Sequence, residues 1–137
     1  MVDANPQTFA FDRIDRRTQK VTPALITAIT ERIVATIKPR QIVLFGSQVT
    51  KENHNQSDID LLICLDDHHP LAFKRRHERT AVILDLFRYR SFGLDIIVLT
   101  QGEVQGLIDA NEGEWDLVIE ILKKGKLLYE YSAPVDA

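Results

Sequence analysis

Apolar residues recur along this chain in two periods, which predict an alternation of helices and strands. The first period is helical, with isoleucines spaced by three or four residues at Ile26, Ile29, Ile33 and Ile37. Thr22 is suited to cap such a helix, and Pro23 is suited to its first turn. Pro39 follows the last isoleucine of the stripe. We therefore expect an amphipathic helix that begins at Thr22 and ends near Pro39.

Three short apolar runs predict buried strands, namely residues 41–45 (QIVLF), 58–65 (DIDLLICL) and 94–99 (LDIIVL). The second run alternates: Ile59, Leu61, Ile63 and Leu65 share one face, and Asp58, Asp60, Leu62 and Cys64 share the other. A short final strand is expected over residues 127–131 (LLYEY).

Helices are expected between and after these strands. Residues 70–90 are rich in helix formers, and one side of that helix is predicted to carry Leu71, Phe73, Ala81, Leu84 and Phe87. Thr100 and Glu103 have capping-box spacing at the start of a helix over residues 101–110. A later stripe runs from Trp115 to Leu122, with Gly125 placed as its C-terminal cap. This order of elements predicts an α/β or α+β domain with one mixed β-sheet flanked by helices.

Composition is that of a single globular domain. The 137 residues are 45% hydrophobic and 27% charged, and residues 22–137 are expected to form one small domain. Residues 1–21 have no sustained period and are interpreted as an N-terminal extension that a partner could order. The net charge of -3 gives no support for direct nucleic-acid binding.

No apolar run reaches the length of a membrane span, and the N-terminus lacks the order of a signal peptide. Cys64 is the only cysteine, so an internal disulfide is excluded. We therefore expect a cytoplasmic protein with no membrane contact, in which Cys64 is an inert core residue.

Three aspartates are the candidate catalytic and metal-binding residues. Asp58 and Asp60 are two apart in a predicted strand, so their side chains share a face. Their mutual repulsion is relieved by a divalent cation, and Mg²⁺ prefers carboxylate oxygen. Two such ions can be bridged by paired carboxylates in phosphoryl transfer. Asp95 joins them if the strands over 58–65 and 94–99 are neighbours.

Gly46 and Ser47 lie at the other end of the same segment, directly after the strand over 41–45. Glycine allows a backbone to approach a ligand closely, and the Ser47 hydroxyl and N–H suit a phosphate. A phosphate-binding turn and a pair of metal-binding carboxylates, joined by one loop, are typical of phosphoryl or nucleotidyl transfer.

Gly46-Ser47, ten residues, then Asp58-Ile59-Asp60 resembles the signature of the polymerase-β-like nucleotidyltransferase superfamily. The LFGS, SDIDLL, LDIIVLT and ILKKGKLLYE segments resemble its minimal nucleotidyltransferase (MNT) branch. This resemblance implies that Asp58, Asp60 and Asp95 bind two Mg²⁺ ions and that Asp95 helps to activate the acceptor hydroxyl. It also implies that Gly46-Ser47 hold the triphosphate of ATP, the nucleotide substrate.

The resemblance also implies a partner. Members of this branch are commonly antitoxins of a HEPN-domain ribonuclease toxin, and some transfer AMP from ATP to a toxin tyrosine. Many continue Gly-Ser with Arg-Ala-Arg-Gly, whereas this chain has Gln48, Val49, Thr50 and Lys51. Two alternatives stay open: an antitoxin that acts by direct binding with a weak or inactive site, and a nucleotidyltransferase acting on a small molecule.

Other polar clusters have simpler interpretations. Adjacent aspartates such as Asp58 and Asp60 can also be caps or turn formers. Asp66, Asp67, His68, His69 and His77 have no zinc-site spacing and are more typical of a loop that enters a helix. The basic run over residues 74–79, with Arg88 and Arg90, is interpreted as a solvated helix face, with contact to a phosphate or an acidic partner as the alternative.

Overall fold

The fold was analysed in a computed structural model, which describes residues 21–50, 58–90, 92–111 and 116–132. The predicted extension over residues 1–21 lies outside the described residues except for Val21. The helices and strands are α1 (Pro23–Ile37), β1 (Gln41–Phe45), α2 (Ser47–Thr50), β2 (Ile59–Leu65), α3 (Arg76–Leu84), β3 (Leu94–Thr100), α4 (Gln101–Ala110), α5 (Leu117–Lys124) and β4 (Lys126–Glu130). No helix in these ranges is long and apolar enough to cross a membrane.

The four strands form one sheet in the order β3-β2-β1-β4. β1 pairs antiparallel with both β2 and β4, whereas β2 and β3 run parallel. The sheet is therefore mixed, and the predicted α+β class is confirmed. β2 and β3 are neighbours, which was the condition for Asp95 to approach Asp60.

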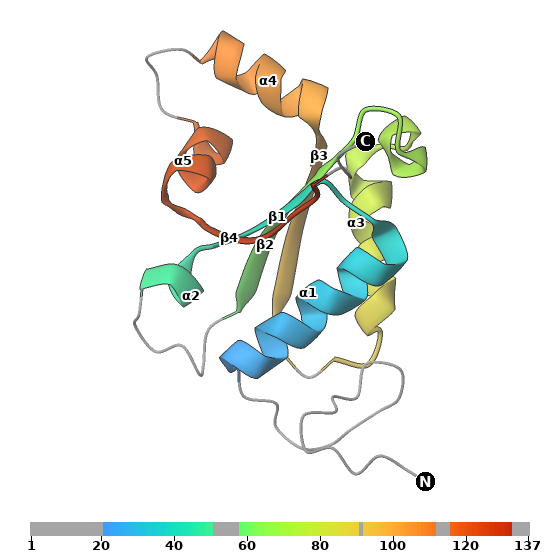
Figure 1. The fold of residues 1–137 in the computed structure, drawn as a ribbon, viewed down its shortest axis with the longest axis vertical. Helices are drawn as coiled ribbons and strands as arrows, with labels where there is room; N and C mark the ends of the chain where they lie inside the picture. Colours follow the sequence, from blue (N-terminus) through green and yellow to red (C-terminus); the bar gives the residue numbers. More distant parts are fainter. Residues whose placement is uncertain (1–20, 51–57, 91, 112–115, 133–137) are drawn as a thin grey trace, which may run out of the picture.

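Helices cover both faces of this sheet (Figure 1). On one face, α1 and α3 pack against Ile59, Leu61 and Ile63 of β2. On the other face, Leu62 and Cys64 belong to a smaller cluster with residues of α5. The two faces of β2 are those predicted from its alternation. Because apolar residues line both faces, β2 is the buried centre of the fold, and every residue of Leu61–Leu65 is buried.

Local capping explains where the helices begin. The Thr22 hydroxyl accepts a hydrogen bond from Leu25 N–H at 3.1 Å, and α1 ends at Lys38 in the left-handed conformation. Thr100 and Glu103 form the predicted capping box of α4. Asp116 caps α5 and Gly125 follows its last turn, while Trp115 lies outside the described residues.

The single helix expected over residues 70–90 is wrong. A 3-10 turn over Pro70–Phe73 is followed by extended backbone at Lys74, and the α-helix begins only at Arg76. Of the expected apolar side, Leu71 and Phe87 are still buried in one core cluster and Leu84 packs against it. Phe73 is 78% exposed instead of facing the core, and Ile83 is buried. Ala81, another residue of the expected apolar side, is exposed.

Arg79 corrects the interpretation of the basic run as wholly solvated, because its side chain is only 4% exposed. It makes an ion pair with Glu103 of α4, with Nη1 to Oε1 at 2.7 Å. Its remaining N–H groups donate to backbone carbonyls of Leu71, Ala72, Lys74 and Val98. Hydrogen bonding to Arg79 also lowers the pKa of the Glu103 carboxyl. One buried guanidinium thus connects the 3-10 turn, α3, β3 and α4.

Replacing Arg79 is expected to destabilise the fold. Arg79→Met leaves Glu103 and several carbonyls without their donor, so we expect a loss of about 3 kcal/mol in the free energy of unfolding. Urea denaturation measures it, and the exposed Lys74→Met variant is the control for loss of a positive charge. Equal and small losses in the two variants would contradict the role assigned to Arg79.

Candidate active site

The strand register brings two of the predicted carboxylates together. In the parallel pair of β2 and β3, Asp60 is the direct partner of Asp95. On its other side Asp60 is opposite Phe45, the last residue of β1. Residues paired across neighbouring strands point to the same face of a sheet. Both carboxylates therefore point to the face that α4 and α5 cover only in part.

Burial and the neighbouring carboxylates favour the protonated form of Asp60. The pKa of Asp60 is raised to about 6, first by burial, then by repulsion from Asp95 and a hydrogen bond with it, and last by the Asp58 charge. A divalent cation held by Asp60 and Asp95 would relieve this repulsion. The donor set of two carboxylates thus fits a hard cation such as Mg²⁺.

Asp58 lies just before β2 and is exposed. Its carboxylate packs against Gly93, so closely that a Cβ atom at residue 93 would overlap it. Among the residues that the structure describes, no three His, Cys, Asp or Glu side chains are close enough to hold a metal ion. The structure therefore joins Asp60 to Asp95, while the assignment of Asp58 as a third ligand stays a prediction.

Gly46 connects β1 to α2 beside the carboxylate pair. Its φ of +77° lies in the left-handed region, which disfavours any residue with a side chain. A Cβ atom here would also overlap the Oδ2 atom of Asp60. The backbone at Gly46 thus lies against Asp60, in accordance with the predicted closeness of the two ends of the segment.

The residues after Gly46 are described less fully. α2 begins at Ser47, but the Ser47 side chain lies outside the described part. Gln48, the first residue of the segment that departs from the pattern of the MNT branch, is 8% exposed. Lys51, the basic residue that follows, lies outside the described residues.

A cavity of about 260 Å³ adjoins Gly46 and was missed in the sequence. It lies between the end of β1 and α5, and is lined by Phe45, Gly46, Val49, Leu117, Glu120, Ile121, Lys124 and Gly125. Seventy residues separate Phe45 from the α5 part of this wall, so no local pattern signals it. The presence of Gly46 among the lining residues places the cavity next to the carboxylate pair.

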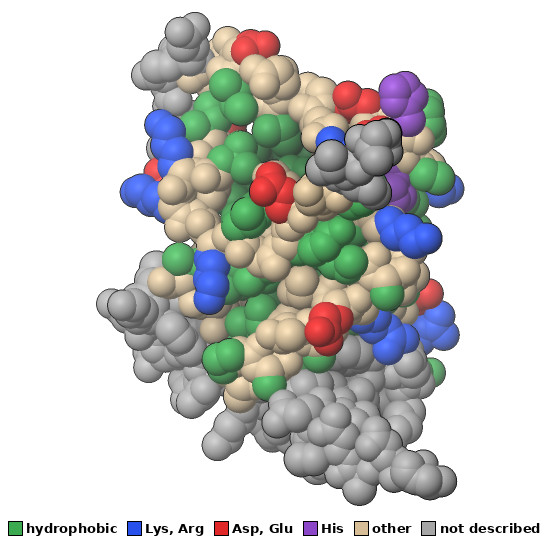
Figure 2. All heavy atoms as spheres, viewed as in Figure 1, with side chains coloured by type: hydrophobic (Ala, Val, Ile, Leu, Met, Phe, Trp, Pro, Cys, Tyr) green, Lys and Arg blue, Asp and Glu red, His purple; other side chains and the backbone are tan. Residues whose placement is uncertain are grey.

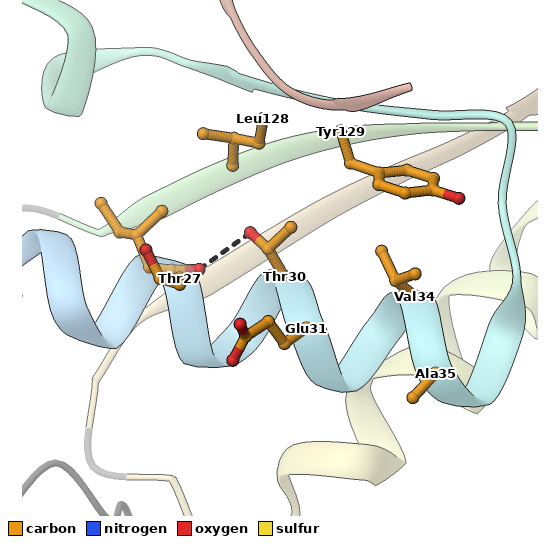
Figure 3. Close-up of a pocket in the computed structure, with 8 residues that line it drawn as sticks. Thr27, Thr30, Glu31, Val34, Ala35, Leu128 and Tyr129 are labelled. Atoms are coloured by element: carbon orange, nitrogen blue, oxygen red, sulfur yellow. Dashed lines mark hydrogen bonds between the residues drawn. The ribbon is translucent and has the colours of Figure 1, made fainter. Parts of the chain in front are cut away.

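A larger hollow of about 400 Å³ lies elsewhere, between α1 and β4 (Figure 3). Its wall includes Thr30, whose hydroxyl donates to the Ile26 carbonyl at 2.8 Å, and Tyr129 of β4. It contains none of the candidate carboxylates and lies on the α1 side of the sheet. The volume of a cavity alone therefore does not identify the one that lies next to the candidate active site.

His68, His69 and the neighbouring aspartates have structural partners, in agreement with the simpler interpretation of this loop. His69 caps the 3-10 turn by accepting from Leu71 N–H at 3.0 Å, and its Nε2 lies 2.6 Å from the Ile37 carbonyl. Asp66 accepts from the His68 N–H, and Asp67 accepts from the Gly102 N–H. Burial raises the pKa of the Cys64 thiol to about 11, which keeps it protonated and unreactive.

Comparison with known proteins agrees with this geometry. The family described as "Polymerase beta, Nucleotidyltransferase" matches residues 28–133, most of the chain. The protein belongs to this nucleotidyltransferase family. The match spans Gly46-Ser47 and all three aspartates.

The fold is also similar to that of a crystal structure from Sulfolobus solfataricus, described as a provisional nucleotidyltransferase. The TM-score is 0.50 at 19% sequence identity, over 77% of this chain and 78% of that one. No curated protein matches the sequence. The nucleotidyltransferase fold and family are thus established, and nucleotidyl transfer is the class of activity that they support.

The raised pKa of Asp60 predicts a pH dependence of stability for this nucleotidyltransferase. Because the folded-state pKa of about 6 exceeds the ordinary 3.8, protonation of Asp60 favours the folded state. That contribution is complete below about pH 4 and is lost as the pH rises through about 6. In chelator-treated protein, Asp60→Asn should therefore gain stability relative to wild type between about pH 4 and pH 7.

Urea denaturation across this pH range measures the difference, with Asp109→Asn on exposed α4 as the control. A difference between wild type and Asp60→Asn that does not change with pH would contradict the raised pKa of Asp60.

Gly46 is expected to tolerate no side chain. Gly46→Ala combines an unfavourable φ with an overlap on Asp60, so we expect a loss of about 1–3 kcal/mol in the free energy of unfolding. Gly106→Ala in α4 is the matched control, because nothing lies within 4 Å of its added Cβ atom. That variant should gain up to about 1 kcal/mol. Thermal unfolding compares the two, and equal behaviour would refute the constraint at Gly46.

Proposed function

We propose that this nucleotidyltransferase is a Mg²⁺-dependent enzyme that transfers AMP from ATP to a tyrosine of a HEPN-domain toxin and thereby silences it. The observation that carries the enzymatic part is the pairing of Asp60 with Asp95 beside the Gly46 turn. The choice of partner and acceptor is supported by the resemblance of LFGS, SDIDLL and ILKKGKLLYE to the MNT branch.

The proposed reaction joins the tyrosine Oη atom to the α-phosphorus of ATP. The bond between that phosphorus and the bridging oxygen to the β-phosphate breaks, and pyrophosphate leaves. The hydroxyl proton passes to a carboxylate, and we assign this role to Asp95. Its exposure on β3 and its interaction with Asp60 support the assignment. Bound Mg²⁺ supplies charge stabilisation for the phosphates. Asp60 holds the ion, and Asp58 is the additional ligand proposed from the sequence.

The acceptor side of the site supports a macromolecular substrate. Asp58 and Asp95 are both exposed, so the end of the sheet that carries the carboxylates is open to solvent. A small acceptor needs enclosing walls to be positioned for in-line attack. A protein acceptor brings its own surface and positions its tyrosine by contacts outside the site.

A second function is favoured by one specific observation. Gln48 is buried at the position where related sequences have an arginine for the nucleotide, and glutamine supplies no charge there. On this alternative the protein is an antitoxin that neutralises its HEPN partner by binding, and the site is weak or inactive.

Asp60→Asn separates the two functions. For the enzyme, we expect the variant to lose AMP transfer by at least about a hundredfold, because the carboxylate pair can no longer hold the cation. Wild type or variant is mixed with ATP, Mg²⁺ and the purified HEPN partner, and the partner is then weighed by mass spectrometry. A mass gain of one or more AMP groups with wild type alone supports the enzyme.

The exposed Asp109→Asn variant serves as the control and should transfer at the wild-type rate. Unimpaired transfer by Asp60→Asn would contradict the metal assignment. Inhibition of the toxin by wild type without any gain in mass would support the binding alternative.

A further inference from the structure

Phe73 is the most exposed large hydrophobic side chain among the residues that the structure describes, with 78% of its surface accessible. The other exposed side chains of this kind lie between 38% and 49%. Single exposed apolar residues are common on protein surfaces, so exposure alone does not indicate a function. What distinguishes Phe73 is the way in which the fold holds its backbone.

The backbone on both sides of Phe73 is fixed by a buried side chain. Arg79 donates to three carbonyls around it at 3.0 Å each, those of Leu71, Ala72 and Lys74. The Lys74 N–H also donates to the Leu71 carbonyl at 3.1 Å. A segment that is already ordered loses less conformational entropy when it binds a partner. Phe73 is therefore an aromatic side chain that the fold presents to solvent in a preorganised turn.

Three exposed basic residues follow Phe73 directly in the chain, namely Lys74, Arg75 and Arg76. Figure 2 shows basic, hydrophobic and histidine side chains together at the upper right, where Figure 1 places the turn before α3. The chain as a whole has a net charge of -3. An exposed aromatic residue with three adjacent cations is thus a local exception on an acidic protein.

The acidic residues of this region are engaged with backbone groups. Glu78 accepts from a backbone N–H at the start of α3. Asp66 accepts from an N–H of its own loop, and Asp67 accepts from an N–H of α4. Both aspartates come before the turn, whereas the three cations come after it. The segment that follows Phe73 is therefore the positive side of the turn, and a carboxylate-bearing surface complements it.

A protein accounts for this surface better than a nucleic acid does. Single-stranded nucleic acids also stack on aromatic residues, but their sites combine this stacking with a positive groove that follows the phosphate backbone. Here the cations are confined to one short stretch, and the acids of the adjacent segments repel a phosphate chain. An aromatic side chain surrounded by a polar rim is typical of the energetic centre of a protein interface.

We propose that Phe73, with a rim of Lys74, Arg75 and Arg76, is the surface on which the partner protein docks, and that the partner offers an apolar pocket bordered by carboxylates. The inference rests on the proposed function, because this surface supplies the contacts outside the site that position a protein acceptor. The turn follows the end of β2, whereas Asp60 lies at the start of that strand.

The docking surface and the carboxylates are thus separated by about the length of one strand, roughly 20 Å. A helix of about 14 residues covers this distance, so a helical partner domain can contact both ends of the sheet at once. Docking and transfer therefore depend on different residues of this chain and can be measured separately.

Two substitutions test the docking surface, and each has a matched control on β4. Phe73→Ala removes the aromatic anchor and should weaken binding of the purified HEPN partner at least about tenfold. Arg75→Glu reverses a charge of the rim and should slow association about tenfold at low salt, with a smaller effect at high salt. Leu127→Ala and Lys126→Glu are the controls, because both residues are exposed and lie on a different element.

Each protein is first shown to be folded by thermal unfolding, and its binding to the HEPN partner is then measured by biolayer interferometry at two salt concentrations, without ATP. The docking surface predicts weaker binding for Phe73→Ala, slower and less salt-dependent association for Arg75→Glu, and wild-type binding for both controls. Mass spectrometry of the partner, after incubation with ATP and Mg²⁺, reports AMP transfer independently of binding.

Three results overturn the inference. If Phe73→Ala and Arg75→Glu both bind the partner as wild type does, the docking surface lies elsewhere. If Phe73→Ala loses binding of oligouridylate but not of the partner, the surface takes single-stranded nucleic acid instead. If wild type does not bind the HEPN partner, the inference fails together with the proposed partner. Binding that depends on Phe73 without any transfer of AMP supports the docking surface and contradicts the proposed enzyme.

Discussion

The position of β2 between β1 and β3 is the constraint on which the site depends. β2 must pair antiparallel on one side and parallel on the other, and both registers meet at Asp60. Ile59, Leu61 and Ile63 are fully buried on the face opposite to Asp60. A shift of one residue would place the carboxylate in the apolar layer below α1 and α3. The hydrophobic core thus makes every other register of β2 unfavourable, and in this way it determines where the Asp60 carboxylate lies.

The same packing holds two carboxyl groups close together at the site, which is electrostatically unfavourable when both are charged. Asp60 and Asp95 are held side by side by backbone pairing, so they cannot separate to relieve their repulsion. The backbone of Gly46 packs against the Asp60 carboxylate, and this contact adds to the burial of that carboxylate. A fold that holds two acids in this way gains stability when a cation or a proton joins them. Such strained arrangements are a common feature of functional sites.

Much of this arrangement was predicted from local patterns. The alternation in β2 assigned its two faces, and the capping box at Thr100 and Glu103 placed the start of α4. The approach of Asp95 to Asp60 was predicted only on the condition that their strands are neighbours, since strand order depends on contacts distant in sequence.

The features that were missed have the same physical origin. Nothing local distinguishes Arg79 from the solvated basic residues before it, since its burial depends on Glu103, on Val98 and on the 3-10 turn. His69 caps the start of the 3-10 turn, and the backbone leaves that turn in an extended conformation at Lys74. The cavity at Phe45 is likewise formed by α5, which is distant in the chain.

Two side chains of α3, Arg79 and Thr80, form hydrogen bonds with the outer edge of β3. Ile59 N–H donates to the Gly93 carbonyl, so in the parallel register the carbonyls of Ile96 and Val98 point away from β2. Thr80 donates to the first of these at 3.2 Å, and Arg79 donates to the second at 3.2 Å. Another strand cannot add to β3 without displacing both donors. The outer edge of β3 at Ile96 and Val98 is therefore closed to strand exchange, which leaves the sheet to end at β3 on this side.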